Sequence, residues 1–169
     1  MDIAELLVDH FERVRGEVHR VLEGLGPEEL LTRVDEDANS IAWLVWHLTR
    51  VQDDHVASAF DVAQVWTAHG WEERFALPLP TADIGYGHSS KDVAAVAVTS
   101  GELLTGYHDA VCAQTLGLVT SVSGSDLDRI VDESWDPPVT LGVRLVSVLG
   151  DDLQHVGQAA FIRGLLARR

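Results

Sequence analysis

The sequence has 169 residues, of which 46% are hydrophobic and 23% are charged, values typical of a globular chain that forms one domain. We therefore expect a single domain over residues 1–169. Its 27 acidic residues against 12 lysines and arginines give a net charge of −15. This surplus repels nucleic-acid phosphates and anionic lipid surfaces, and it argues against both as partners.

The N-terminus and the cysteine content favour a cytoplasmic location. The first five residues contain two acids where a secretory signal carries basic residues. The longest apolar runs, such as residues 41–46 and 93–98, are much shorter than a membrane-spanning helix. Cys112 is the only cysteine, which excludes an intrachain disulfide, and its Ala/Val-rich surroundings favour a packing role over a nucleophilic one.

Two amphipathic helices are predicted in the first part of the chain. Residues 3–25 repeat apolar side chains at spacings of three and four, and a pair of glycines ends the pattern. Residues 27–30 form a short helical turn that begins with proline. Asn39 and Ser40 are suitable N-caps for the second helix, whose apolar stripe continues over residues 41–60.

A long crossover loop and a third helix follow. Residues 61–88 mix tryptophan, proline and glycine, which predicts a loop with one helical turn near residues 71–75. Ser89 and Asp92 form a capping-box pattern, and the apolar segment beyond them predicts a helix that continues to about Gly117.

The last helix completes an all-α fold. Gly101 and Gly106 fall inside the predicted third helix, so they either allow close packing or bend the helix there. Residues 136–138 contain two prolines and break the chain, and Thr140 caps a helix that continues to about Leu166. Four long helices, with no convincing strand pattern, predict a four-helix bundle.

Polar residues interrupt the apolar pattern at two places. His47 lies in an otherwise apolar part of the second helix, and residues 151–158 form a polar segment within the last helix. A buried titratable side chain is costly unless it is paired, hydrogen-bonded or metal-bound. Two histidines and one carboxylate form the smallest set for a metal site with open coordination positions. His47 taken alone is more typical of a hydrogen-bonded core histidine than of a metal ligand.

Either of two adjacent aspartates can supply the carboxylate. Asp151 precedes His155 by four residues and Asp152 precedes it by three, so both share a helix face with it. At about 100° per residue, Asp152 points most directly toward the apolar stripe, with His155 on one flank and Asp151 beyond it. The periodicity therefore favours Asp152 as the inward carboxylate, and it also makes this residue a candidate for the pocket.

Three further polar residues are candidates for the pocket lining. Asp54 follows His47 by two turns on the same face, about 10 Å along the helix, which is too far to share one ion directly. His88 lies just before the third helix and can reach the open end of the bundle, although a role in the turn is more typical of such a position. Gln158 ends the polar segment of the last helix.

Residues 39–48 and 155–158 resemble the DinB-like superfamily, which includes metal-dependent thiol transferases and the mycothiol-dependent maleylpyruvate isomerase N-terminal domain. The resemblance covers most of the chain and implies an up-down-down-up bundle with a long crossover between helices two and three. In that family, one histidine of helix two and two histidines of the last helix commonly bind one divalent metal. By position these are His47, Asp151 and His155, with aspartate in place of the middle histidine.

The resemblance also implies a function. It points to a metal-dependent transferase or isomerase that acts with a low-molecular-weight thiol, such as mycothiol, on a small electrophile. Zinc and nickel are the foremost candidate metals, and the metal would lower the pKa of the bound thiol. Trp66, Trp71 and Tyr86 of the loop would cover the substrate. The alternative is a non-catalytic bundle that binds a metal or small ligand, and in either case the resemblance implies a homodimer.

Overall fold

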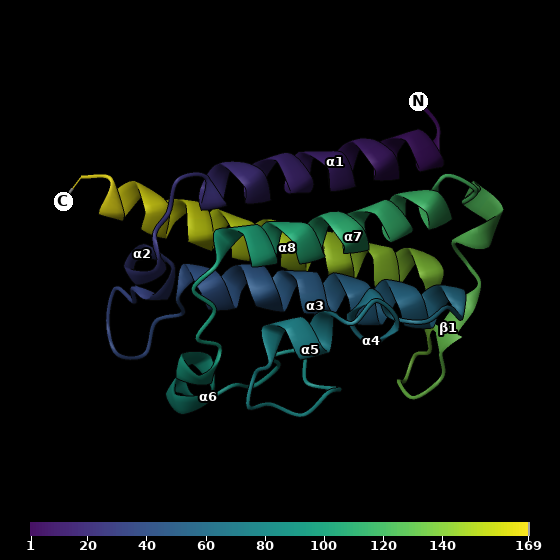
Figure 1. The fold of residues 1–169 in the computed structure, drawn as a ribbon. Coiled ribbons are helices and arrows are strands. Elements are labelled where there is room, and N and C mark those ends of the chain that lie inside the picture. The colour runs from purple at the N-terminus through teal and green to yellow at the C-terminus, as the bar shows by residue number, and fades with distance from the viewer. Residues whose placement is uncertain (169) are drawn as a thin grey trace.

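The computed structural model describes residues 1–168, and four long helices lie side by side in it (Figure 1). The elements in chain order are α1 (Ile3–Leu22), α2 (Pro27–Leu31), α3 (Ile41–Phe60), α4 (Val65–Ala68), α5 (Trp71–Phe75), α6 (Ser90–Ala95), α7 (Gly101–Val119), the 3₁₀ turn η1 (Gly124–Asp126), β1 (Ile130–Asp132), β2 (Val139–Thr140) and α8 (Leu141–Leu166). α3 and α7 run opposite to α1, and α8 runs parallel to α1. The predicted all-α, up-down-down-up bundle is therefore confirmed.

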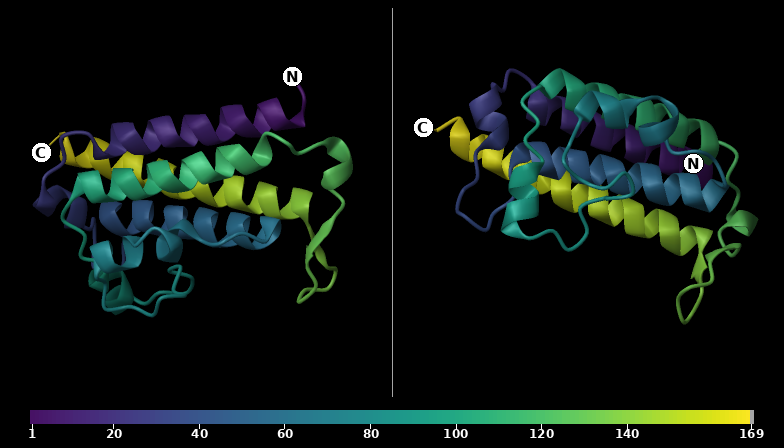
Figure 2. Two further views of the ribbon diagram at one scale, coloured as in Figure 1. Left: turned by 45° about the vertical axis from the view of Figure 1, so that its right-hand side comes forward. Right: turned by 60° about the horizontal axis from the view of Figure 1, so that its bottom comes forward.

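The four long helices form a ring in which each one packs against two others. α1 contacts α7 and α8, and α3 contacts the same two, with the most extensive contact between α3 and α8. α4, α5 and α6 lie on the side of α3 that faces away from α1 (Figure 2). α3 is therefore enclosed by the bundle on one side and by the crossover on the other, which explains why its first ten residues are all buried.

Side-chain caps start α3 and α8 where the sequence predicts them. The Ser40 hydroxyl accepts a hydrogen bond from the backbone N–H of Trp43 at 3.1 Å, and Thr140 caps α8 in the same way. α1 begins with a capping box formed by Asp2 and Glu5. Each such cap typically stabilises a helix by about 1 kcal/mol.

The prediction of one continuous third helix is wrong. α6 ends at Ala95, residues 96–100 are irregular, and α7 begins at Gly101 with Ser100 as its N-cap. The side chains of Val96 and Val98 in this connection are buried in the core. Their burial extends the apolar pattern across the break, which is why the periodicity resembles a single helix.

Aromatic side chains attach the crossover to α7. Trp66, Trp71 and Phe75 surround Tyr107, with ring centroids 5.2, 5.6 and 5.6 Å from it. A Cβ at Gly106 would lie 3.0 Å from the Trp71 ring. Of the two roles predicted for glycines in this helix, close packing is therefore the one that Gly106 has.

A small antiparallel ribbon, which the sequence did not predict, connects α7 to α8. It pairs β1 with β2. The strands have three and two residues, too few to display an alternating pattern. Among residues 1–168, no helix has the length and apolar character that crossing a membrane requires.

A buried histidine of α7 makes the stability of the fold sensitive to acid. His108 Nδ1 donates to the hydroxyl of Thr49, which itself donates to the Val45 carbonyl, and burial lowers the pKa of His108 to about 4. A histidine of the unfolded chain titrates near 6.5. Between these two values the unfolded state binds more protons than the folded state. The free energy of unfolding therefore falls as the pH decreases, by up to about 1.4 kcal/mol per pH unit.

This acid sensitivity is measurable by urea unfolding at pH 7, 6 and 5. His108→Gln removes the titrating group, so we expect a lower stability at pH 7 but a flatter decline toward pH 5 than in the wild type. His69→Gln, at an exposed position, is the control and should retain the wild-type slope. A wild-type slope in His108→Gln would show that another group causes the acid sensitivity.

Candidate metal centre

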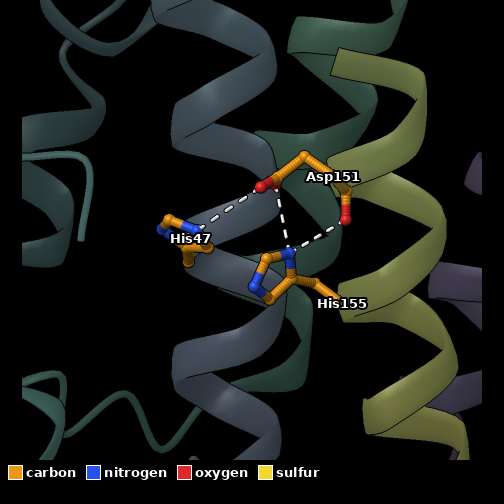
Figure 3. A group of neighbouring side chains, drawn as sticks. All are labelled: His47, Asp151 and His155. Atoms are coloured by element: carbon orange, nitrogen blue, oxygen red, sulfur yellow. Dashed lines mark hydrogen bonds and ion pairs between the residues drawn. The ribbon is translucent and has the colours of Figure 1, made fainter. Parts of the chain in front are cut away.

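His47, Asp151 and His155 lie together at the contact between α3 and α8 (Figure 3). One potential ligand atom from each residue lies within 4.8 Å of those of the other two. His47 Nε2 is 3.9 Å from Asp151 Oδ1, and the two imidazole rings are 4.5 Å apart between centroids. The structure thus brings together His47, His155 and Asp151, the carboxylate that the family resemblance implies, rather than Asp152, which the periodicity favours.

The geometry of a single helix, α8, brings two of the three side chains together. Asp151 and His155 are one turn apart on α8, so their side chains project from the same face. The third group, His47, comes from α3, the helix with which α8 has its most extensive contact. The cluster therefore depends on one local spacing and one helix-helix contact.

Both histidines direct Nδ1 at a backbone carbonyl oxygen. His47 Nδ1 donates to the carbonyl of Ile84 in the crossover, and His155 Nδ1 donates to the carbonyl of Asp151 at 2.9 Å. A carbonyl oxygen can only accept, so the proton of each neutral ring lies on Nδ1. Nε2 then carries the free lone pair, which is the arrangement typical of metal-binding histidines.

The electrostatics of the cluster suit a cation. Burial lowers the pKa of His47, which keeps this imidazole neutral and able to ligate at neutral pH. Burial also acts to lower the pKa of His155, but the neighbouring carboxylate and backbone carbonyl of Asp151 outweigh burial and raise that pKa. The carboxylate therefore favours positive charge at this position, whether a proton or a metal ion carries it.

The donor set also fits a divalent ion. Asp151 Oδ2 is 3.2 Å from His155 Nδ1, whose proton is directed at the carbonyl, so this buried oxygen has no hydrogen-bond partner among the described residues. Tetrahedral zinc with bonds near 2.1 Å holds its ligands about 3.4 Å apart. The 3.9 Å separation of His47 Nε2 and Asp151 Oδ1 is close to that value, and all three ligand atoms lie within 4.8 Å of one another.

A cavity of about 400 Å³ opens beside the cluster, a volume within the range of small-molecule sites. Its lining consists of His47, Val51, His55, Ile84, Tyr86, Val146, Ser147, Gly150, Asp151 and Gln154. Three polar residues of this lining, His55, Ser147 and Gln154, were not predicted from the sequence. The spacing of Gln154, three residues after Asp151 on the same helix face, could have identified it.

The cover predicted for the substrate consists of one aromatic residue rather than three. Tyr86 lines the cavity and is 90% exposed. Trp66 and Trp71 are buried in the core and belong to the aromatic cluster around Tyr107, so their predicted role over the substrate is wrong.

Asp152 points into the interior of the bundle, as the periodicity predicts, but it lies outside the cluster. Its side chain is fully buried, and neither carboxyl oxygen has a hydrogen-bond partner among the described residues. Burial, together with the negative charge of Asp151, raises the pKa of Asp152 well above its ordinary value. Of the two adjacent aspartates, Asp151 is therefore the one placed as the candidate ligand.

The other polar candidates, Asp54, His88 and Gln158, do not line this cavity. Asp54 Oδ1 accepts from Gln64 and its Oδ2 contacts His55 Nδ1. Gln158 lines a separate groove of about 500 Å³ near the start of α3. His88 bonds to Trp43 and to Asp83.

Cys112 has the packing role that its surroundings predict. Its side chain is buried, and burial raises the pKa of its thiol to about 11. A thiol with this pKa is almost entirely protonated at neutral pH and is a poor nucleophile.

A larger groove lies elsewhere on the described chain. A groove of about 910 Å³ separates the end of α1 from the start of α7. It is open, and its residues do not form a cluster of three metal-ligating groups within the described range. The smaller cavity beside His47 is therefore the better candidate for chemistry, because convergent polar groups indicate a site more strongly than volume does.

Comparison with known proteins places the chain in a family. A model of the mycothiol-S-transferase family matches residues 6–168. The chain is also similar to a crystal structure of a conserved protein from Enterococcus faecalis, with 30% identity, coverage of 100% of this chain and 99% of that chain, and a TM-score of 0.91. No functionally curated protein matches it. The chain therefore belongs to the mycothiol-S-transferase family of DinB-like proteins.

Proposed function

We propose that this protein is a divalent-metal-dependent S-transferase that joins a mycothiol-like thiol to a small electrophile. The observation that carries the proposal is the convergence of His47, Asp151 and His155 beside an open cavity. The family match supports a thiol as the co-substrate. Zinc and nickel are the metals we propose, since two imidazoles and one carboxylate suit both ions.

In this proposal each residue of the cluster has a defined task. His47 and His155 would hold the ion through Nε2, and Asp151 would hold it through a carboxylate oxygen. A bound divalent ion supplies Lewis acidity that lowers the pKa of the thiol, so that thiolate is available at neutral pH. The carbonyls of Ile84 and Asp151 keep both imidazoles oriented, and Tyr86 lies where it can contact a substrate in the cavity.

The test is turnover of a thiol with a haloarene. In this reaction the thiolate sulfur attacks the ring carbon, the new C–S bond replaces the C–halogen bond, halide leaves with the bonding electrons, and the thiol proton passes to solvent. We expect zinc- or nickel-loaded protein to consume mycothiol and release halide in equal amounts. Chelator-treated protein and His47→Ala should proceed at the rate of the uncatalysed reaction.

Two other outcomes are informative. Metal binding without turnover for a panel of electrophiles would support the non-catalytic alternative, a bundle that only holds a metal or a small ligand. A wild-type rate in the chelated protein would exclude metal dependence. Pairing into a homodimer and a cytoplasmic location stay predictions from the sequence.

A further inference from the structure

A turn of the crossover lies directly on the His47 imidazole. Gly85 has a φ of +90°, and a Cβ at this position would lie 2.6 Å from His47 Nδ1, 3.1 Å from the Trp46 ring and 3.2 Å from the Trp43 ring. A separation of 2.6 Å is impossible without displacing the imidazole or the turn. Glycine is therefore required at residue 85 both by the backbone conformation and by the close approach.

Asp83 holds the turn in its shape and attaches it to the bundle. Its Oδ1 accepts from the backbone N–H of Gly85 at 2.7 Å, and its carboxylate accepts from His88 Nε2 at 2.9 Å. Its backbone carbonyl accepts from Arg50 Nε of α3 at 3.2 Å. One aspartate thus closes the turn and connects it to the helix that carries His47.

His88 connects the other end of the turn to the same helix. The Trp43 indole N–H donates to His88 Nδ1 at 3.0 Å, so His88 is neutral and carries its proton on the nitrogen that faces Asp83. The Trp43 ring stacks on His47, with centroids 4.5 Å apart and an interplanar angle of 14°. The imidazole of His47 is therefore bounded by Trp43 on one face and by Gly85 at Nδ1, where the Ile84 carbonyl also binds it.

We propose that the turn of residues 83–88 is a positioning device for His47, with Gly85 as its essential residue. The turn directs a carbonyl oxygen at Nδ1, fixes the proton there and leaves Nε2 free toward Asp151. Asp83 and His88 act through the turn and touch neither the ion nor the substrate. The effect on metal affinity rests on the function proposed above, whereas the effect on the His47 ring does not.

The chain offers a matched pair of variants for the test. Gly85 and Gly87 both have positive φ, but a Cβ at Gly87 would have no neighbour within 4 Å. Gly85→Ala and Gly87→Ala therefore carry the same kind of backbone strain, and only Gly85→Ala creates the contact with His47. Circular dichroism and thermal unfolding of both variants should show folded bundles, because the turn lies outside the four long helices.

The first readout is the tautomer of His47 in the metal-free protein, measured by ¹⁵N NMR of the imidazole nitrogens. We expect the wild type and Gly87→Ala to show the proton on Nδ1, and Gly85→Ala to lose this signature. The second readout is zinc affinity, measured by competition with a chelator. We expect Gly85→Ala to lower it by about 10–100-fold, the usual effect of disturbing the outer partner of a metal-binding histidine, and Gly87→Ala to leave it unchanged.

The two readouts separate this proposal from the metal site. Equal tautomer signals and equal affinities in Gly85→Ala and Gly87→Ala would overturn the positioning role. If no variant and no wild-type protein binds zinc or nickel, the metal site fails, but the tautomer comparison still decides whether the turn orients His47. His88→Ala provides a second test, since it should weaken the Nδ1 signature without placing any atom against the ring.

Discussion

Replacing either His47 or His155 by alanine is expected to lower the affinity for zinc or nickel by more than about 100-fold. Disturbing only the outer partner of a ligating histidine typically costs about 10–100-fold, so removing the ligand itself should cost more. Each histidine supplies one of the three converging donors, and the remaining two cannot hold an ion at comparable strength. Chelator competition gives the affinity, and elemental analysis of protein purified without a metal-affinity column gives the metal content.

His55→Ala is the matched control for these variants. His55 lies on α3, the helix that carries His47, and it lines the cavity beside the cluster. It lies outside the cluster of His47, Asp151 and His155. Its loss should leave metal affinity within a few-fold of the wild type. Equal metal content in the wild type, His47→Ala and His155→Ala would remove the proposed site.

Asp53→Ala is expected to lower the free energy of unfolding by about 3–5 kcal/mol, more than any other substitution proposed here. Asp53 is buried beside Arg50, with 3.6 Å between Oδ2 and Nη1, and its carboxylate accepts hydrogen bonds from Tyr107 and from the backbone of Val65 and Trp66, each at 2.8 Å. The guanidinium of Arg50 is fully buried. Removing one partner of a buried ion pair leaves an uncompensated charge, which has a cost of that size.

Urea unfolding at neutral pH measures this loss, and the adjacent residue provides the control. Asp54 has the same charge on the same helix, but its side chain is 32% exposed. Asp54→Ala should therefore destabilise the protein by only about 1 kcal/mol, as is usual for pairs that are accessible to water. Similar losses in the two variants would show that the burial of Asp53 with Arg50 is not what stabilises the crossover.

Local patterns predicted most of the helical fold. The spacing of apolar residues in 3–25 and 41–60, and the caps at Ser40 and Thr140, gave the positions of three long helices within a few residues. The same patterns failed at residues 96–100, where buried valines continue the apolar run across an irregular connection. Apolar periodicity indicates which side chains are buried. It does not distinguish a buried helix from a buried irregular connection, because the two differ in the conformation of the backbone.

The candidate site was predicted in part. His47 and His155 were identifiable as polar residues in apolar helices, but the choice between the two aspartates was not. The helical wheel correctly directs Asp152 to the interior. The cluster nevertheless contains Asp151, because it lies at the edge of the bundle between α3 and α8 rather than on its axis.

The sequence by itself determined the helical class, the caps, the strongly acidic charge and the few polar residues that interrupt apolar stripes. These properties follow from composition and from the 3.6-residue period of one helix, and no other segment is needed to read them. Only the tertiary structure decided that Asp151 faces His47, that Asp53 pairs with Arg50 inside the core, and that the turn around Gly85 covers an imidazole 38 residues earlier in the sequence. Such contacts depend on how each helix is rotated and on where a long crossover packs, and both are set by the packing of the whole bundle.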